Sequence, residues 1–72
     1  MNITERRNSL LKALHRRGHD TIQNLAIEFD VSERTIRRDI TELSLYEPIY
    51  TMPGRYGGGV YVLRTTKKEE SS

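Results

Sequence analysis

Apolar residues in the first part of the chain recur at the spacing of an amphipathic helix. Leu10 and Leu14 lie about one helical turn apart, and with the residues around them they predict a first helix over residues 2–17. Thr4 is the expected N-cap of this helix. Gly18 is the expected stop, because glycine adopts the left-handed conformation that ends many helices.

Two further stripes of helical period follow after short breaks. The first predicts a helix over residues 22–29, with Thr21 as its cap. The second predicts a helix over residues 33–45, with Ser32 as its cap. Helices joined by so few residues have the spacing of a helix-turn-helix. The apolar positions that define the two stripes are Ile22, Leu25, Ala26 and Phe29, then Ile36, Ile40 and Leu43.

The pattern changes period after Pro48, which ends any helical continuation. Residues 49–52 and 59–63 are rich in β-branched and aromatic side chains, so they predict two strands joined by a glycine-rich loop over residues 53–58. A hairpin after three helices is the arrangement of a winged helix. Residues 65–72 contain no apolar side chain and are expected to form a disordered tail or a linker stub.

The predicted fold class is therefore mainly α with a small β-hairpin, a winged helix-turn-helix of three helices and a wing over residues 1–64. The 72 residues suffice for one domain, and the absence of cysteine excludes disulfides and thiolate metal sites. The 12 basic and 10 acidic residues give a net charge of +2, too small a sum to indicate a polyanionic partner by itself. No apolar run is long enough for a membrane span or a signal peptide, so a cytoplasmic location is expected.

The third predicted helix has one apolar side and one basic side. At about 100° per residue, Ile36 and Ile40 define the core direction, and the arginines of this helix lie on the outward half. Such a helix fits the major groove of DNA, where arginine binds a guanine edge or phosphate and threonine allows close approach. An ordinary solvated basic face is the alternative interpretation. The outward set is Arg34, Thr35, Arg37, Arg38 and Thr41.

Arg55 and Tyr56 lie at the tip of the predicted hairpin, between Gly54 and a run of three glycines. Glycine lets a tip lie close to a phosphate backbone and leaves backbone N–H groups accessible. We therefore expect Arg55 to contact phosphate or the minor groove, and Tyr56 to bind phosphate or cover a sugar. The alternative is an ordinary hairpin loop in which Tyr56 folds back on the sheet.

The other polar residues that could carry chemistry are Asp39 and two histidines. A carboxylate aimed at DNA would repel phosphate, so we expect Asp39 to pair within the protein, with Arg6 or Arg7 as candidate partners. His15 and His19 are four residues apart, and surface positions are favoured over a metal site because no further spaced ligand accompanies them. No nucleophile–base set or phosphate-binding glycine loop is present, so neither an enzyme nor a cofactor is predicted.

Residues 31–40, with the sequence VSERTIRRDI, resemble the recognition-helix signature of DeoR-type winged-helix repressors. Residues 25–29 are similar to the second-helix pattern of the same group. Residues 48–50 and 54–59 resemble the wing of related small helix-turn-helix regulators. The resemblance covers about residues 4–63, and its specific part is the Thr-Ile-Arg-Arg-Asp string after Val-Ser.

This resemblance implies sequence-specific binding of double-stranded DNA in bacterial transcription control, and we expect a repressor. The helix over 33–45 would lie in the major groove and the hairpin over 49–63 would act as the wing, with Arg55 as its contact. A second copy on paired half-sites is a further expected partner, although the sequence predicts a monomer in isolation. The residues implied to read DNA are Ser32, Arg34, Thr35, Arg37 and Arg38.

Two alternatives stay open from the sequence. Full-length DeoR-type regulators carry a large effector domain that usually senses a sugar phosphate, and no small-molecule effector site is visible here. The chain is therefore expected to be either an excised DNA-binding domain or a small regulator of the kind that mobile elements and phages encode. The rival function is a winged helix that serves as a protein-interaction module through Tyr50, Tyr61 or the first helix, without binding DNA.

Overall fold

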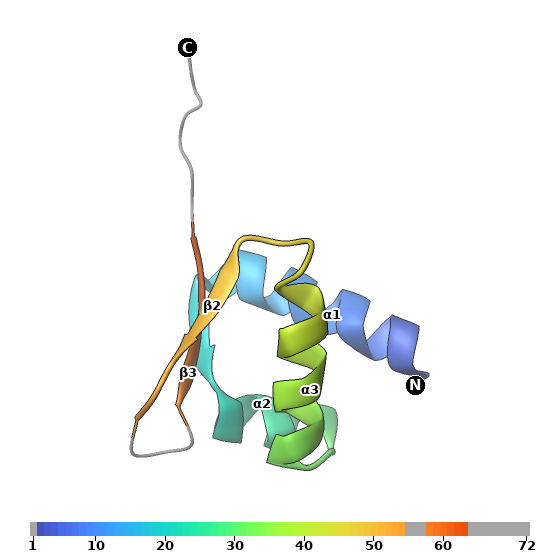
Figure 1. Ribbon diagram of the computed structural model, residues 1–72. Coiled ribbons are helices and arrows are strands. Elements are labelled where there is room, and N and C mark those ends of the chain that lie inside the picture. The colour runs from blue at the N-terminus through green and yellow to red at the C-terminus, as the bar shows by residue number, and fades with distance from the viewer. Residues whose placement is uncertain (1, 55–57, 64–72) are drawn as a thin grey trace.

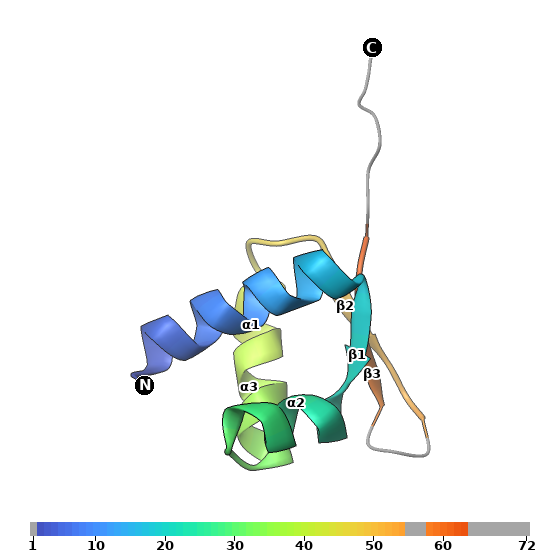
Figure 2. The same ribbon diagram turned by 180° about the vertical axis from the view of Figure 1, so that it is seen from behind.

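The computed structural model describes residues 2–54 and 58–63, which form three helices and a three-stranded antiparallel sheet (Figures 1 and 2). The last two strands form the hairpin, so the predicted mainly α, winged helix-turn-helix fold is confirmed. In chain order the elements are α1 (Ile3–Arg17), β1 (His19–Thr21), α2 (Ile22–Phe29), α3 (Glu33–Leu43), β2 (Ile49–Met52) and β3 (Gly59–Val62).

The first helix begins at a capping box that the sequence prediction missed. The side chain of Asn2 accepts from the backbone N–H of Glu5 at 2.8 Å, and the Glu5 carboxylate accepts from the Asn2 backbone at 3.3 Å. The cap therefore lies two residues before Thr4, and the reciprocal pair satisfies the N–H groups of Asn2 and Glu5. Gly18 ends α1 as predicted, with φ of 87° and its N–H bonded to the carbonyl of Leu14 at 2.7 Å.

The caps of the other two helices are those that the sequence predicts. Thr21 and Ser32 each accept a backbone N–H of the following turn through their side-chain oxygens. The predicted end of α3 was two residues too late, since the helix ends at Leu43. Beyond it the N–H of Leu45 bonds to the carbonyl of Glu42 at 3.2 Å, which is the tighter spacing that often finishes a helix.

Strand β1 is an element that the sequence analysis treated as a short connection. It pairs antiparallel with β3, which also pairs with β2, so the strand order is β1-β3-β2. The N–H of Val62 bonds to the carbonyl of Gly18 at 2.9 Å, and the N–H of Ile22 bonds to the carbonyl of Gly58 at 3.0 Å. These two bonds flank the strand and tie the hairpin to the connection between α1 and α2.

The hydrophobic core lies between the helices and the inner face of the sheet. Figures 1 and 2 show α1 crossing α3, with the sheet standing to one side of both. Each predicted helical stripe contributes to this core, which is why the three helices hold one arrangement. The buried apolar cluster consists of Leu10, Leu14, Ile22, Leu25, Ala26, Ile36, Ile40, Ile49 and Val60.

Three aromatic rings stack on the outer face of the sheet. His19, Tyr61 and Tyr50 are direct neighbours across β1, β3 and β2. The ring centroids of His19 and Tyr61 are 4.9 Å apart, and those of Tyr61 and Tyr50 are 5.5 Å apart. Cross-strand ring pairs of this kind stabilise a sheet, so the two tyrosines considered for a protein partner have a structural role within the wing.

Arg17, at the end of α1, connects three elements. Its guanidinium donates two hydrogen bonds of 2.8 Å to the carboxylate of Glu28 in α2, and one of 2.8 Å to Asp20 in β1. Burial would raise the pKa of Asp20, but its hydrogen bonds, first among them that from the Thr21 backbone, hold the pKa below its ordinary value. The hydrogen bonds from Arg17 likewise lower the pKa of Glu28, so both partners are anionic at neutral pH.

Candidate nucleic-acid interface

A turn of three residues sets α3 against α2. Asp30 ends α2 in the left-handed conformation, with φ of 56° and ψ of 49°, which aspartate tolerates better than most residues. Its N–H donates to the carbonyl of Ile27 at 3.2 Å, and the N–H of Val31 donates to that of Ala26 at 3.0 Å. Ser32 then caps α3. These contacts fix the start of α3 at the protein surface.

The two sides of α3 meet different environments. Ile36, Asp39 and Ile40 are buried, whereas Arg34 and Arg38 are exposed, as the spacing predicts. Within residues 2–54 and 58–63, no ion pair or side-chain hydrogen bond involves Arg34 or Arg38. A guanidinium group that contacts no protein carboxylate is available to bind another anion or a base edge.

Arg37 lies on the side of α3 that faces the wing. Its Nη2 atom is 3.6 Å from Oε1 of Glu33, one turn earlier, and the two side chains are 54% and 42% exposed. An exposed pair at this separation contributes at most about 1 kcal/mol.

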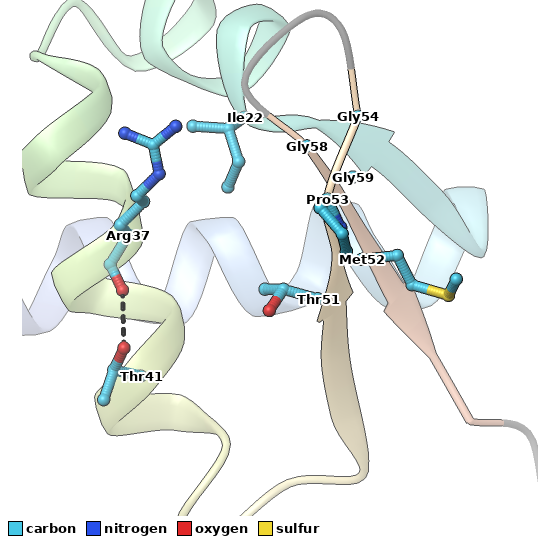
Figure 3. Close-up of a pocket in the computed structure, with 9 residues that line it drawn as sticks. All are labelled: Ile22, Arg37, Thr41, Thr51, Met52, Pro53, Gly54, Gly58 and Gly59. Carbon is cyan, nitrogen blue, oxygen red and sulfur yellow. Dashed lines mark hydrogen bonds between the residues drawn. The ribbon is translucent and has the colours of Figure 1, made fainter.

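A groove of about 470 Å³ separates α3 from the wing (Figure 3). Arg37 and Thr41 line it from α3, while Thr51 of β2 and Gly54 beyond it line the opposite wall. In Figure 3 the Thr51 hydroxyl and the Arg37 guanidinium both point into the space between the two elements. One wall therefore carries a cation and both walls carry hydroxyl groups, which is a combination that binds phosphate oxygens.

The predicted hydroxyl residues are engaged in holding α3. The Ser32 hydroxyl donates to Oγ1 of Thr35 at 3.0 Å and accepts from the Thr35 backbone at 3.1 Å. The hydroxyl of Thr41 donates to the carbonyl of Arg37 at 2.9 Å, the bond drawn in Figure 3. The protons of Ser32 and Thr41 are thus used within the protein, whereas the Thr35 hydroxyl accepts in its printed bond. A phosphate oxygen only accepts, so Ser32 or Thr41 binds one by turning its hydroxyl proton away from its present acceptor.

On the wing, the sequence predicted two contact residues and missed a third residue that lines the groove. Arg55 and Tyr56 lie outside the residues that the structure describes. Thr51 was missed, although alternation along β2 indicates its position: it shares the inner face with the buried Ile49. Because side chains two residues apart lie on the same face of a strand, Thr51 points toward α3 and lines the groove.

Asp39 is the buried charge of this region. Its side chain is fully buried and accepts hydrogen bonds from Arg6 and Arg7 of α1, which confirms the expected pairing and shows that both candidates take part. Burial would raise the pKa of Asp39, but the bonds from Arg6 and then Arg7 hold it below its ordinary value. The acid therefore faces the protein interior as an anion, and it does not oppose an anion on the outer face of α3.

The two histidines have separate neighbours. Nε2 of His15 lies 3.9 Å from a carboxylate oxygen of Glu47, and the His19 ring stacks on Tyr61. Among the described residues, no group of three or more His, Asp or Glu side chains is arranged to hold a metal ion. The helices of the same residues are all too short or too polar to cross a membrane.

Comparison with protein families agrees with this geometry. The family model of the DeoR-like helix-turn-helix domain matches residues 6–65, a range that includes α2, α3 and the hairpin. Searches of curated proteins and of solved structures found no match. Because the match spans most of the chain and includes the turn and the basic helix, the chain belongs to the DeoR-like helix-turn-helix family of DNA-binding transcription regulators.

Proposed function

We propose that this chain binds double-stranded DNA at specific sequences and acts as a transcriptional repressor. In this proposal α3 lies in the major groove and the β2–β3 hairpin acts as the wing. The observation that carries it is the pair Arg34 and Arg38, both exposed on α3, with no protein partner among the described residues. An exposed basic face on a helix that a rigid turn presents at the surface suits groove binding.

The spacing of the two arginines supports a role in reading bases. Arg34 and Arg38 are four residues apart, which is about 6 Å along a helix axis. Successive bases on one strand are about 3.4 Å apart, so the two guanidinium groups can reach different base pairs of one groove. Arginine binds the O6 and N7 atoms of guanine in a bidentate manner, and we assign this role to both residues.

The groove between α3 and the wing supports a second role, which is binding the DNA backbone. We assign Arg37, Thr41 and Thr51 to one phosphodiester strand, because they line the same groove from both sides. Ser32 and Thr35 would contact phosphate at the start of α3, where backbone N–H groups and the helix dipole favour anions. Arg55 and Tyr56 remain the proposed wing contacts, on the sequence pattern alone.

The assembly and location follow from the same proposal. A single domain of this size covers one half-site, so we propose that two copies bind paired half-sites and block transcription there. Residues 1–64 would form the binding unit, and the protein would act at the nucleoid in the cytoplasm. As a repressor, the bound protein would exclude RNA polymerase from the site and would not recruit it.

The test uses duplexes that the wild-type chain selects from a random-sequence library. Arg38→Ala is expected to lower affinity for a selected duplex about 5- to 150-fold, the equivalent of about 1–3 kcal/mol, with a smaller loss on random duplex. Fluorescence anisotropy titrations measure both. Arg16→Ala is the matched control, since it removes the same charge from an exposed position on α1.

The control is expected to change both affinities by no more than about threefold. Equal loss on selected and random duplexes would show that Arg38 holds phosphate only. If the wild-type chain bound no duplex at about 50 mM salt, the DNA proposal would be wrong and a protein partner would replace it.

A further inference from the structure

The first turns of α1 are joined to α3 by a cluster of charged side chains. The buried residues of α1, Leu10, Ala13 and Leu14, lie from its midpoint onward. Figures 1 and 2 show the first turns of α1 reaching across α3 toward the N-terminus. At that crossing Arg6 and Arg7 of α1 both bind Asp39 of α3.

The geometry of this contact is directional. Arg6 donates to both carboxylate oxygens of Asp39, from Nε to Oδ2 at 2.5 Å and from Nη2 to Oδ1 at 2.9 Å. Nε of Arg7 donates a third bond to Oδ1 at 2.9 Å. Bidentate pairing fixes orientation as well as distance. A buried ion pair adds little net stability because desolvation offsets its attraction, and its best-supported use is to select one arrangement of the chain.

The orientation of α3 matters because its outward side chains extend far from its axis. A helix with its side chains has a radius of about 5–6 Å, so a rotation of about 20° about the axis moves an arginine tip by about 2 Å. Hydrogen bonds to base edges tolerate only about 0.5 Å. The apolar contacts of Ile36 and Ile40 are not directional, whereas the bonds to Asp39 are.

We infer that Asp39, held by Arg6 and Arg7, is a positioning residue that sets the rotation of α3 and thereby the sequence preference of the domain. This inference rests on the proposed function. Asp39 is next to Arg38 in the chain, but Asp39 is buried and Arg38 is exposed. The helix turn that Asp39 fixes to α1 therefore also carries the arginine that we assign to base reading.

The first test compares Asp39→Asn with Glu42→Gln. Both substitutions remove one negative charge from α3, but Glu42 is exposed, and the bonds that Arg6 and Arg7 make to α3 go to Asp39. The measured quantity is the ratio of affinities for the selected and the random duplex, in protein shown to be folded by circular dichroism. We expect Asp39→Asn to lower this ratio at least tenfold while binding random duplex as Glu42→Gln does, and Glu42→Gln to keep the ratio of the wild type.

A second variant covers the case in which Asp39→Asn does not fold. Replacing all three charges by apolar side chains, Arg6→Met, Arg7→Met and Asp39→Leu, removes the directional bonds without leaving a buried charge unpaired. The net charge falls by one, as it does in Arg16→Ala, which serves as its control. We expect this variant to be folded, to bind random duplex as its control does, and to lose at least tenfold in the affinity ratio.

The outcomes separate the two proposals. Suppose that the wild type prefers selected duplexes and that a folded variant of either kind keeps the same affinity ratio. This result overturns the positioning role alone. A wild type with no preference among duplexes overturns the proposed function and this inference with it. A loss of equal size on selected and random duplexes also overturns the positioning role, because rotation of α3 does not remove phosphate attraction.

Discussion

At the scale of single residues, the buried charge of Asp39 links folding to pH. Burial would raise the pKa of this carboxyl group, but hydrogen bonds from Arg6 and Arg7 hold it below the ordinary value. The ionised form is therefore favoured more in the folded chain than in the unfolded chain. The resulting stability is present above the unfolded pKa of about 3.9 and is lost as the pH falls through the folded pKa.

Asp39→Asn is expected to remove this acid dependence. The free energy of unfolding of the wild type should exceed that of the variant most at neutral pH, and the difference should shrink below about pH 4. Urea unfolding followed by circular dichroism between about pH 7 and about pH 3 measures the difference. Asp20 and Glu28 titrate in both proteins, so their contributions cancel. A difference that did not change with pH would contradict the assignment.

The positions of single residues along the sequence predicted much of the site. They did not predict the contacts made where two helices cross. The outward position of Arg34 and Arg38 follows from the helical period, because α3 is regular and amphipathic. The pairing of Asp39 within the protein was predicted because its carboxylate would repel phosphate. That Arg6 and Arg7 bind it together depends on how α1 crosses α3, and no local pattern encodes that crossing.

At the scale of elements, the shape of the wing depends on Gly58. This residue has φ of 92°, and a Cβ atom added to it would lie 2.8 Å from the carbonyl oxygen of Met52. Its own carbonyl accepts the N–H of Ile22 at 3.0 Å, so its position also fixes the start of α2. Only a residue without a Cβ atom satisfies both conditions without strain.

Gly58→Ala is expected to lower the free energy of unfolding by about 1–3 kcal/mol, because it combines a strained φ with a steric clash. For a domain of this size each kcal/mol lowers Tm by about 4–8 °C, so thermal melts resolve the effect. Gly54→Ala is the control, since a Cβ atom there would lie 3.7 Å from the nearest atom, in ordinary contact. Equal melting temperatures for the two variants would show that the wing relaxes around Gly58.

The elements that sequence predicted best are those with several turns of regular pattern. The stripes of α2 and α3 each bury their apolar side, so period alone located them. Strand β1 has three residues, too few to show alternation, and it exists because β3 lies beside it. The cap at Asn2 was missed because Thr4 is also a good capping residue, and the reciprocal bond with Glu5 decided between them.

At the scale of the whole molecule, the proposed interface combines α3 with the wing. The sequence predicted Arg37 and Thr41 on the outward half of α3, where they line one wall of the groove, but Thr51 on the other wall was identified only from the assembled sheet. The proposal therefore involves both walls, and DNA binding should respond to substitutions on the wing as well as on α3.

Salt dependence measures this combined surface. With about four to six phosphate contacts, the logarithm of the binding constant should fall against the logarithm of salt concentration with a slope of about −4 to −5. Arg37→Ala should make the slope about one unit less steep, and Arg16→Ala should leave it unchanged. Anisotropy titrations at several salt concentrations give the slopes. A slope near zero for the wild type would show that phosphate contributes nothing to binding.

The strand order has a consequence for synthesis on the ribosome. In the described sheet, β1 and β2 each pair with β3 and not with each other. A nascent chain that has released β1 and β2 but still holds β3 in the exit tunnel therefore has no partner for either strand. The sheet can assemble only after the last strand emerges, so translation must pass almost the whole domain before its wing exists.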